Sequence, residues 1–415
     1  MKKYGCIGKK LTHSFSKEIH AKLADYKYEL IELSEDELEG FFNKKDFSAI
    51  NVTIPYKQAV IPYLDSLSDA AKRMGAVNTI INRDGKLYEY NTDYYGMKSL
   101  AGKSGIEIKG KKVLTLGTGG TSKTARILTE DMGAAEIITV SRNKTDEYIS
   151  YEDALNNHTD ADVIINTTPS GMYPDCNSVP IDISGFSRLE GVLDAVYNPL
   201  CTNLVMKAKE KGIKAECGLY MLVMQAVVAV EKFLDTKISK TAADKAFAEV
   251  LLSKENIVLT GMPGSGKSTV GNLLNLENFT FIDTDEEIEK RCGCSIKELI
   301  NSKGEKYFRD LETEVIKDIS SEGCRIISTG GGAVLRKENT DYLKRNGKLF
   351  FIDADFDRLL PTDSRPLSDT TEKLKKLYDE RADIYKSTAD VIVPDMPTPR
   401  DEAEFILKAR TELIK

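Results

Sequence analysis

Residues 256–268 read NIVLTGMPGSGKS, an apolar, β-branched run that leads into a glycine-rich loop. The octapeptide from Gly261 to Ser268 fits the pattern G-x-x-x-x-G-K-[ST] in full, and a helical pattern follows it. In a strand–loop–helix of this kind, glycines let backbone N–H groups approach phosphates, the lysine reaches the outer phosphates and the last hydroxyl can bind Mg²⁺. We therefore predict a site for a nucleoside phosphate and Mg²⁺. Its residues are Gly261, Gly264, Gly266, Lys267, Ser268 and Thr269.

A second glycine-rich turn of this kind occurs earlier in the chain. The strand-like run 113–116 leads into Gly117, Gly119 and Gly120, and a helical pattern covers 121–132. Two such turns about 145 residues apart predict two separate nucleotide-binding units. Strand and helix patterns alternate after Gly117, which is typical of a parallel α/β sheet. These strand patterns cover 136–140, 162–166 and 192–196.

Composition excludes several other classes of protein. The 415 residues carry a net charge of −7 with both signs spread along the chain, so no basic footprint for nucleic acid is present. The longest largely apolar stretch, Gly218 to Val230, is too short to span about 30 Å of hydrocarbon, and the start of the chain has no signal-peptide pattern. Seven cysteines without a C-x-x-C pair indicate reduced thiols and a cytoplasmic protein with small-molecule partners. The oligomeric state is not encoded in any recognisable pattern.

Polar residues after the phosphate loop narrow the acceptor of the phosphoryl group. Asp283 and Asp285 are expected at a strand end on one pleat face, where one would serve Mg²⁺ and the other an acceptor hydroxyl. The alternative for Asp285 is to cap a helix predicted over 286–291. Three glycines, 330–332, permit close approach of a small ligand to the backbone. Candidate clamps for a carboxylate and for the transferred phosphoryl are Arg309, Arg365 and Arg381.

Residues 254–415 resemble shikimate kinase over essentially their whole length. The matching pieces are GMPGSGKS, FIDTD, GEKYFRDLE, STGGGAV, SRPL and DERADIY. The resemblance implies a phosphate-loop kinase with a doubly wound parallel sheet, ATP and Mg²⁺ as cofactors, and Ser268 and Asp283 at the metal. It also implies that Arg365 closes over the γ-phosphoryl and that Arg358 stacks on adenine. The residues implied to hold shikimate are Asp285, Arg309, Gly331, Gly332 and Arg381. A gluconate-type or adenylate-type kinase shares the phosphate loop but leaves these residues unexplained.

In the first half, the residues after the strand pattern at 136–140 predict the cofactor. An Asp or Glu usually stands there in enzymes that use NAD, where it holds the ribose hydroxyls. This chain has Ser141 and Arg142 instead, and a guanidinium would pair with a 2′-phosphate, so we predict NADP. Lys57 and Asp93 each follow a strand pattern, and a lysine beside a carboxylate can donate a proton to the alkoxide that hydride transfer creates.

Residues 1–253 resemble shikimate dehydrogenase. The motifs are HSFS, NVTIPYK, GAVNTI, NTDYYG, LGTGGTS, INTTPSGM, DAVYNPL and GLYMLVMQA. The resemblance implies a substrate lobe, about 1–100 and 218–253, and a Rossmann-like NADP lobe, about 101–217. Lys57 would be the general acid–base group, with Asp93 beside it. Substrate contacts are implied for Ser14, Ser16, Thr53, Asn78, Tyr197 and Gln225, and cofactor contacts for Gly117, Gly119, Gly120, Ser141, Arg142, Thr167, Gly218 and Met221.

Two departures from this family pattern lie near the cofactor. Ser141 replaces the usual asparagine before the clamp arginine, and Tyr220 replaces a glycine beside the nicotinamide, where we expect it to alter cofactor fit. Quinate dehydrogenases share the architecture, so acceptance of quinate stays open.

The two halves imply the same metabolite. The first would reduce 3-dehydroshikimate to shikimate with NADPH, and the second would phosphorylate shikimate to shikimate 3-phosphate with ATP. We therefore expect a bifunctional α/β enzyme whose domains meet between Ser253 and Lys254. The alternative is that one half binds shikimate without catalysis.

Overall fold

The computed structural model of the chain describes residues 2–12, 14–359 and 370–414. The chain divides into two compact units, residues 1–250 and 251–415. The units meet three residues before the expected boundary, because the end of helix α9 (Lys240–Lys254) is bound within the second unit. There the Arg410 guanidinium donates to the carbonyl of Leu252, and the Cys324 N–H donates to the carbonyl of Lys254.

The first lobe of the first unit is a five-stranded sheet of order β2-β1-β3-β4-β5. Strands β1 to β3 are parallel, and β4 and β5 form an antiparallel hairpin. The hairpin turn at Asp84 and Gly85 has positive φ at both residues, as tight hairpin turns require. The strands are β1 (Tyr4–Gly8), β2 (Tyr28–Glu32), β3 (Ala49–Val52), β4 (Thr79–Arg83) and β5 (Lys86–Tyr90). The helices are α1 (Ser16–Leu23), α2 (Glu37–Lys44), α3 (Asp69–Met74) and α8 (Leu219–Leu234), with a 3₁₀ turn at Ile61–Tyr63.

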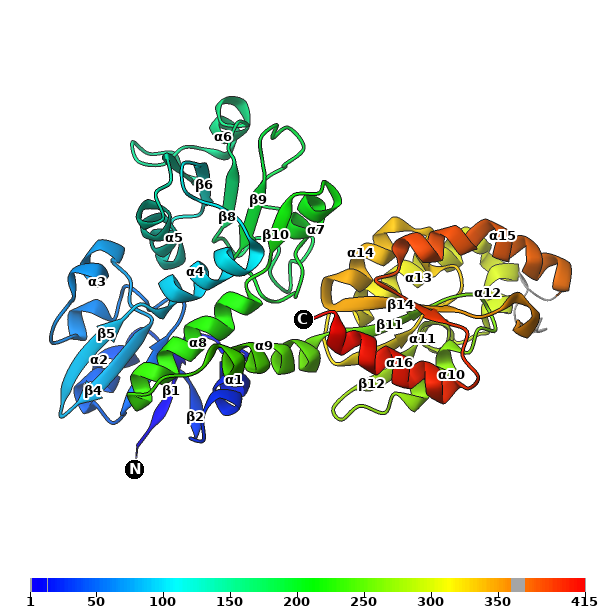
Figure 1. The fold of residues 1–415 in the computed structure, drawn as a ribbon, viewed down its shortest axis with the longest axis horizontal. Helices are drawn as coiled ribbons and strands as arrows, with labels where there is room; N and C mark the ends of the chain where they lie inside the picture. Colours follow the sequence, from blue (N-terminus) through cyan, green and yellow to red (C-terminus); the bar gives the residue numbers. More distant parts are fainter. Residues whose placement is uncertain (1, 13, 360–369, 415) are drawn as a thin grey trace. The chain divides into compact units, whose positions relative to one another are not determined.

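The second lobe of this unit is a parallel sheet of order β10-β9-β8-β6-β7. Its strands are β6 (Lys112–Leu116), β7 (Glu136–Val140), β8 (Val163–Asn166), β9 (Gly191–Asp194) and β10 (Lys214–Glu216). Its helices are α4 (Thr92–Ser104), α5 (Gly120–Asp131), α6 (Tyr151–Asn157) and α7 (Asn203–Glu210). Helices α4 and α8 run side by side between the two sheets (Figure 1). Gly96 permits this approach, because a Cβ atom there would meet the Met221 carbonyl oxygen at 2.5 Å.

The second unit is one parallel sheet of order β12-β13-β11-β14-β15. The strands are β11 (Asn256–Thr260), β12 (Thr280–Asp283), β13 (Arg325–Ser328), β14 (Gly347–Asp353) and β15 (Val391–Pro394). The helices are α10 (Lys267–Leu273), α11 (Thr284–Cys292), α12 (Ile296–Lys303), α13 (Glu305–Ile319), α14 (Lys337–Asn346), α15 (Thr371–Thr388) and α16 (Pro399–Glu412). Two 3₁₀ turns cover Ala333–Leu335 and Phe356–Arg358. The phosphate loop follows the central strand β11, where doubly wound sheets bind ligands.

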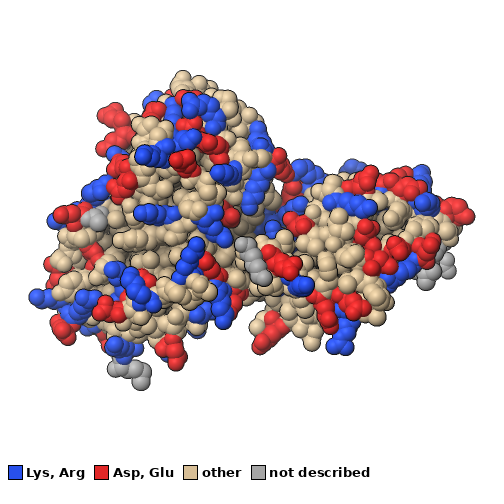
Figure 2. Space-filling model, viewed as in Figure 1, with Lys and Arg blue, Asp and Glu red and all other residues tan. Residues whose placement is uncertain are grey.

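The described residues show the following distribution of charge and hydropathy. Lys and Arg are interspersed with Asp and Glu over the visible face of each unit (Figure 2). Among the residues that the structure describes, no helix has the length and apolar character that crossing a bilayer would require.

Candidate active sites

Lys57 and Asp93 form an ion pair in the first unit. Lys57 lies in the turns after β3, and Asp93 lies in the first turn of α4. Lys57 Nζ is 2.5 Å from Asp93 Oδ2, and the side chains are only 14% and 9% exposed. Limited solvent around the pair strengthens its attraction. The pair therefore holds a protonated amine in a fixed place.

Asn78 holds the carboxylate of this pair from behind. Its Nδ2 donates to Asp93 Oδ1 at 2.8 Å, and its Oδ1 accepts the Thr92 N–H at 2.7 Å. The Thr92 hydroxyl in turn donates to Gln225 Oε1 on α8 at 3.2 Å. Lys57, Asp93, Asn78 and Gln225, which are far apart in the sequence, thus lie in one hydrogen-bonded cluster.

A buried polar chain that the sequence reasoning missed continues behind Asn78. Tyr28 Oη donates to Asn51 Oδ1 at 2.7 Å, Asn51 Nδ2 donates to Thr79 Oγ1 at 3.0 Å, and Thr79 Oγ1 donates to Asn78 Oδ1 at 3.2 Å. Asn51 is the one polar residue of β3, which reads AINV, and this was the signal that could have found it; Thr79 opens β4, which also contains Asn82 and Arg83, so its position gave no such signal. This series of hydrogen bonds restrains the orientation of the Asn78 amide.

His20 packs at the far end of this polar chain. Its ring stacks on Tyr28 with centroids 3.8 Å apart, and its Nδ1 is 2.6 Å from Tyr26 Oη. Burial lowers the pKa of His20 to about 3. The imidazole is therefore neutral at physiological pH.

The two predicted serines flank Phe15 at the start of α1, and Phe15 contacts Tyr197. The Ser16 N–H donates to Ser14 Oγ at 3.3 Å, and the Phe15 ring between them packs edge-on against Tyr197 with centroids 5.2 Å apart. Burial raises the pKa of Tyr197 to about 12, so its hydroxyl stays neutral. Thr53 packs against Gly8. A Cβ atom added to Gly8 would lie 2.7 Å from Thr53 Cγ2.

The glycine-rich turn after β6 lies directly against Lys57. Gly117 has φ +106°, and a Cβ atom there would be 3.0 Å from Thr167 Oγ1, which donates to the Leu116 carbonyl. Gly119 caps α5, and a Cβ atom on Gly120 would lie 3.5 Å from Lys57 Cβ. Phosphates bind at helix N-termini because free N–H groups point outward there. The predicted cofactor and proton-donor sites are therefore adjacent.

Arg142 is exposed at the end of β7 and makes no hydrogen bond or ion pair among the described residues. Its charge partly offsets the rise that burial causes in the pKa of Tyr151. Ser141 beside it accepts the Asn143 N–H at 3.2 Å. A free guanidinium at this place fits a 2′-phosphate.

The N-terminus of α8 carries two further residues that are predicted to contact the cofactor. Gly218 donates its N–H to the Val196 carbonyl at 2.8 Å, and a side chain there would collide with the Ala195 carbonyl. Met221 is buried one turn further along α8. The effect expected of Tyr220 on cofactor fit stays a prediction. The Tyr220 side chain packs on α9, with Oη donating to Asp244 Oδ1 at 3.0 Å.

The phosphate loop of the second unit follows β11 and uses the left-handed backbone conformations that glycine adopts readily. Gly261, Gly264 and Gly266 have positive φ of +148°, +86° and +87°. Lys267 Nζ donates to the carbonyls of Gly261 at 3.0 Å and Met262 at 2.8 Å. The ammonium thus lies over its own loop, close to where phosphates are expected.

Ser268 and Asp283 lie in contact, as expected of two residues that serve one metal ion. Ser268 Oγ donates to Asp283 Oδ2 at 2.6 Å and lies 3.2 Å from Ser328 Oγ. Oxygen donors of this kind suit Mg²⁺, which is commonly bound by one or two protein ligands together with phosphates and water. The residues present therefore fit the predicted ion.

The structure corrects the expected arrangement of Asp283 and Asp285. Asp283 caps α11, because its Oδ1 accepts the Asp285 N–H at 2.9 Å. The helix consequently starts at Thr284, two residues earlier than expected, and Asp285 lies in its first turn. The two carboxylates therefore share no strand face, and Asp285 is not the cap. The Asp285 side chain instead lies against Gly330. A Cβ atom added to Gly330 would be 2.6 Å from Asp285 Oδ1.

Arg309 on α13 is held by Glu312, which the sequence reasoning did not single out. Arg309 Nη1 is 2.9 Å from Glu312 Oε2, and Glu312 is fully buried. Burial raises the pKa of Glu312, and the Arg309 charge opposes that rise. Glu312 Oε1 has no hydrogen-bond partner among the described residues. Gly332 leaves room for the guanidinium, because a side chain there would collide with it.

These residues line a cavity of about 540 Å³. Arg381 reaches it from α15 and donates to the Gly331 carbonyl at 3.0 Å. Of the predicted residues, the cavity is lined by Gly264, Gly266, Lys267, Ser268, Thr269, Asp283, Asp285, Arg309, Gly331, Gly332 and Arg381. Arg358 is not among its lining residues and pairs with Asp395. Arg365 lies outside the described residues.

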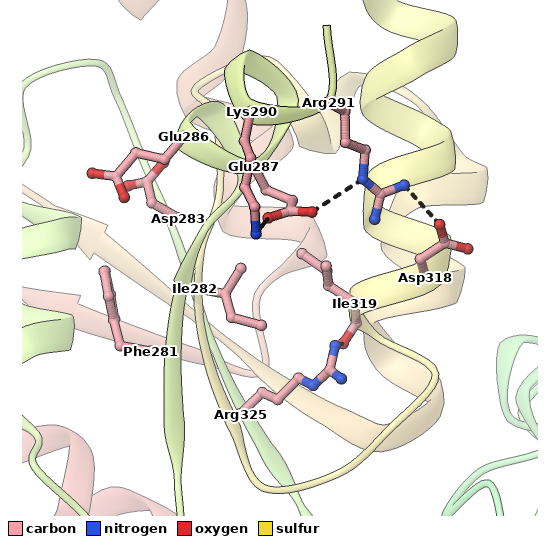
Figure 3. A pocket seen from close by; sticks show the side chains of 10 residues that line it. All are labelled: Phe281, Ile282, Asp283, Glu286, Glu287, Lys290, Arg291, Asp318, Ile319 and Arg325. Carbon is pink, nitrogen blue, oxygen red and sulfur yellow. Dashed lines mark hydrogen bonds and ion pairs between the residues drawn. The ribbon is translucent and has the colours of Figure 1, made fainter. Parts of the chain in front are cut away.

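A second hollow, of about 560 Å³, lies where β12, α11 and α13 meet. Figure 3 shows Arg291 between Glu287 and Asp318, at 3.1 and 2.7 Å. Lys290 also pairs with Glu287, and Arg325 donates to the Ile319 carbonyl. Because each cation in this hollow already has a partner, we interpret it as a surface ion-pair network.

Comparison with known proteins assigns both units. A family model described as shikimate dehydrogenase substrate binding domain matches residues 6–80, and one described as shikimate kinase matches residues 263–410. The NADP(+) shikimate dehydrogenase of Clostridium perfringens strain SM101 is 37% identical over 276 residues, which cover 60% of this chain and 98% of that protein.

Solved structures match the first unit. Shikimate dehydrogenase 1 from Peptoclostridium difficile has 35% identity and a TM-score of 0.56, covering 60% of this chain and 98% of its own. The Thermus thermophilus enzyme, solved in complex with NADP(H) and shikimate, has 26% identity and a TM-score of 0.54. It covers 60% of this chain and 100% of its own.

Fold and sites together define a two-lobed dehydrogenase joined to a phosphate-loop kinase. Both resemblances that the motifs indicated are confirmed by these matches. The chain belongs to the shikimate dehydrogenase family and carries a shikimate kinase domain in its second unit.

Proposed function

We propose that this bifunctional shikimate-pathway enzyme catalyses two consecutive reactions. The first unit reduces 3-dehydroshikimate to shikimate with NADPH, and the second transfers phosphate from ATP to the 3-hydroxyl of shikimate in the presence of Mg²⁺. The observation that carries the proposal is the Lys57–Asp93 ion pair directly against Gly120 of the cofactor turn. We assign the reductase to residues 1–253 and the kinase to residues 254–415.

In the reductase, Lys57 donates the proton that the new hydroxyl requires. NADPH supplies the hydride when it is bound. Lys57 Nζ carries the proton toward the carbonyl oxygen, and Asp93 holds the ammonium in place at 2.5 Å. Asn78 fixes the Asp93 carboxylate, so the proton donor keeps one orientation.

The remaining polar groups of the first unit bind substrate and cofactor. The hydroxyls of Ser14 and Ser16 bind the substrate carboxylate, and Arg142 pairs with the 2′-phosphate of NADP. Ring hydroxyls are bound by Asn78, Asp93 and Gln225, with Thr53 and Tyr197 beside them. The cofactor contacts Gly117, Gly119, Gly120, Ser141, Thr167, Gly218 and Met221.

In the kinase, the chain supplies positive charge and fixed geometry for phosphoryl transfer. Mg²⁺ neutralises phosphate charge when it is bound to Ser268 and Asp283. Lys267 exchanges its loop carbonyls for phosphate oxygens, and Arg309 and Arg381 bind the carboxylate of shikimate. Asp285 accepts a hydrogen bond from the acceptor hydroxyl. Arg365 and Arg358 keep the roles that the sequence predicts, at the γ-phosphoryl and at adenine.

Product analysis by mass spectrometry tests both assignments in one experiment. Purified chain receives 3-dehydroshikimate, NADPH, ATP and Mg²⁺, and a parallel sample lacks ATP. We expect shikimate 3-phosphate in the complete mixture and shikimate alone without ATP. Shikimate in both samples would contradict the kinase assignment and leave the second unit as a binding module. Quinate as a competing substrate measures the specificity of the first unit.

We also propose a cytoplasmic location and small-molecule partners only. All seven cysteines are free in the structure, which suits a reducing compartment. Both charge signs are mixed on the visible surface, which offers nucleic acid no extended basic face.

A further inference from the structure

Two cysteines meet at the turn between α11 and α12 in the second unit. Cys292 is the last residue of α11, Gly293 ends the helix with φ +70°, and Cys294 precedes the Ser295 cap of α12. Cys294 Sγ donates to Cys292 Sγ at 3.5 Å. The two sulfurs are therefore already in contact, with only one glycine between their residues.

The surroundings of this pair leave it accessible and weakly held. Both side chains are half-buried, and Cys292 Sγ also donates to the carbonyls of Cys294 at 3.2 Å and Glu289 at 3.6 Å. The hydrogen bond to Cys292 raises the pKa of the Cys294 thiol. The contact between the two sulfurs also places each thiol where it can resolve a mixed disulfide formed on the other.

The turn connects two helices that line the kinase cavity. Asp285 and Glu289 reach the cavity from α11, and Ile296 and Ile300 reach it from α12. Both cysteines also pack beside the core of these helices, around Ile288 and Leu299. A change in the Cys292–Cys294 distance therefore moves the acceptor end of the cavity and not the phosphate loop.

We propose that Cys292 and Cys294 form a dithiol modification site that low-molecular-weight disulfides oxidise. The Cys292 thiolate attacks one sulfur of the disulfide and releases one thiol. Cys294 then attacks the mixed disulfide, loses its proton and releases the second thiol. The protein gives up two electrons and two protons, which reduce the small disulfide to two thiols.

The disulfide lowers shikimate affinity in the kinase, a consequence that rests on the proposed function of the second unit. A sulfur–sulfur bond is about 2 Å long, so the sulfurs must approach by about 1.5 Å. Cys292 also loses its S–H, and with it the hydrogen bonds to the turn carbonyls. A bond across one residue is strained and easily reduced, which makes the modification reversible.

The first test measures the bond itself. The full-length protein is incubated with oxidised glutathione, alkylated and digested. The mass of the peptide containing Cys292 and Cys294 is then measured by mass spectrometry. We expect this peptide to lose two hydrogens and to resist alkylation until dithiothreitol is added. The matched control is Cys324→Ser, which removes the other cysteine of residues 251–415 and should oxidise as the unmodified chain does. Free thiols at both positions after oxidation would overturn the site.

The second test measures the consequence in both units of the same chain. We expect oxidation to raise the KM for shikimate about five- to tenfold, with the KM for ATP and the rate of 3-dehydroshikimate reduction changed less than twofold. Cys292→Ser should keep the low KM after the same treatment. An unchanged KM in a chain that contains the bond, or an equal loss in Cys292→Ser, would overturn the regulatory effect. Absence of phosphorylation in the reduced chain would instead contradict the proposed kinase, while the peptide mass still decides the site.

Discussion

The two candidate active sites hold their lysines in different ways. Lys57 is paired with a carboxylate that Asn78 fixes in turn. Lys267 donates to two carbonyls of its own loop. In the first unit the partner of the lysine is a side chain that another side chain fixes, whereas in the second the partners of the lysine are backbone carbonyls of its loop.

This difference indicates two strategies for a single pathway. The reductase keeps its proton donor in working orientation, so little reorganisation is needed when substrate binds. In the kinase, phosphate oxygens must replace the loop carbonyls as partners of Lys267. Substitutions in the first unit should therefore act mainly on the chemical step, and several in the second should act on binding.

The largest effect is expected for Lys57→Ala. Loss of the proton donor should lower kcat for 3-dehydroshikimate reduction roughly 10³-fold, while phosphorylation changes less than twofold. The rates of 3-dehydroshikimate reduction and of shikimate phosphorylation are measured on one preparation of the variant and compared with those of the unmodified protein. Lys72→Ala, at an exposed ion pair with Asp69, serves as the control. Loss of both activities in a folded Lys57→Ala chain would contradict two independent sites.

The mirror experiment is Lys267→Ala. Removing this charge from the phosphate loop should reduce phosphorylation roughly 10²- to 10³-fold, because the ammonium stabilises charge on the transferred phosphoryl. Reduction of 3-dehydroshikimate should remain within twofold. Steady-state kinetics with varied ATP will separate binding from catalysis, and a normal kcat would contradict the assigned role.

Arg142→Ala should weaken NADPH binding about 10- to 100-fold, since a charge-assisted contact to a phosphate contributes about 1.5–3 kcal/mol. NADH binding should change little because NADH has no 2′-phosphate. Fluorescence titration with both cofactors makes the measurement. Equal losses for the two cofactors would show that Arg142 supports the fold of the lobe instead.

Lowering the pH should destabilise the first unit through protonation of His20 in the unfolded state. The second unit has no such contribution, since residues 251–415 contain no histidine. The pKa of His20 is about 3 in the folded chain, against about 6.5 unfolded, so below pH 6.5 the unfolded state binds the additional proton. Its contribution should lower the stability of the first unit by about 2 kcal/mol between pH 8 and pH 5. Denaturant unfolding of His20→Phe should lack this part of the pH dependence.

Asp194 makes the stability of the same unit change with pH in the opposite direction. Burial raises its pKa to about 6, so its contribution to stability is complete below about pH 4 and disappears as the pH rises through 6. Asp194→Asn should therefore remove stabilisation on the acid side. If both variants shifted the curve in the same direction, the assigned protonation states would be wrong.

The smallest effect is expected for Thr79→Val, which interrupts the polar chain behind Asn78. We expect about a fivefold loss in kcat for reduction, equivalent to about 1 kcal/mol for one hydrogen bond, and a shifted pH–rate profile. Thr79→Ser retains the hydroxyl and should restore the profile. A loss of stability without change in the profile would limit Thr79 to a structural role.

The sequence by itself was sufficient for features encoded in short, continuous segments. The eight residues from Gly261 to Ser268 contain the whole phosphate loop, and its three glycines have positive φ angles in the structure. The strand at 256–260 also occurs where its apolar, β-branched run predicted it. Such features depend on backbone preferences and on groups adjacent in the chain.

Only the tertiary structure decided how distant side chains share partners. Asp283 rather than Asp285 caps α11, Glu312 holds Arg309, and Tyr220 turns to Asp244 on α9. The series of hydrogen bonds from Tyr28 through Asn51 to Thr79 links three strands of one sheet. Packing determines which of several possible hydrogen bonds each polar group makes, because a buried polar group must find its partner among whichever residues the fold places beside it.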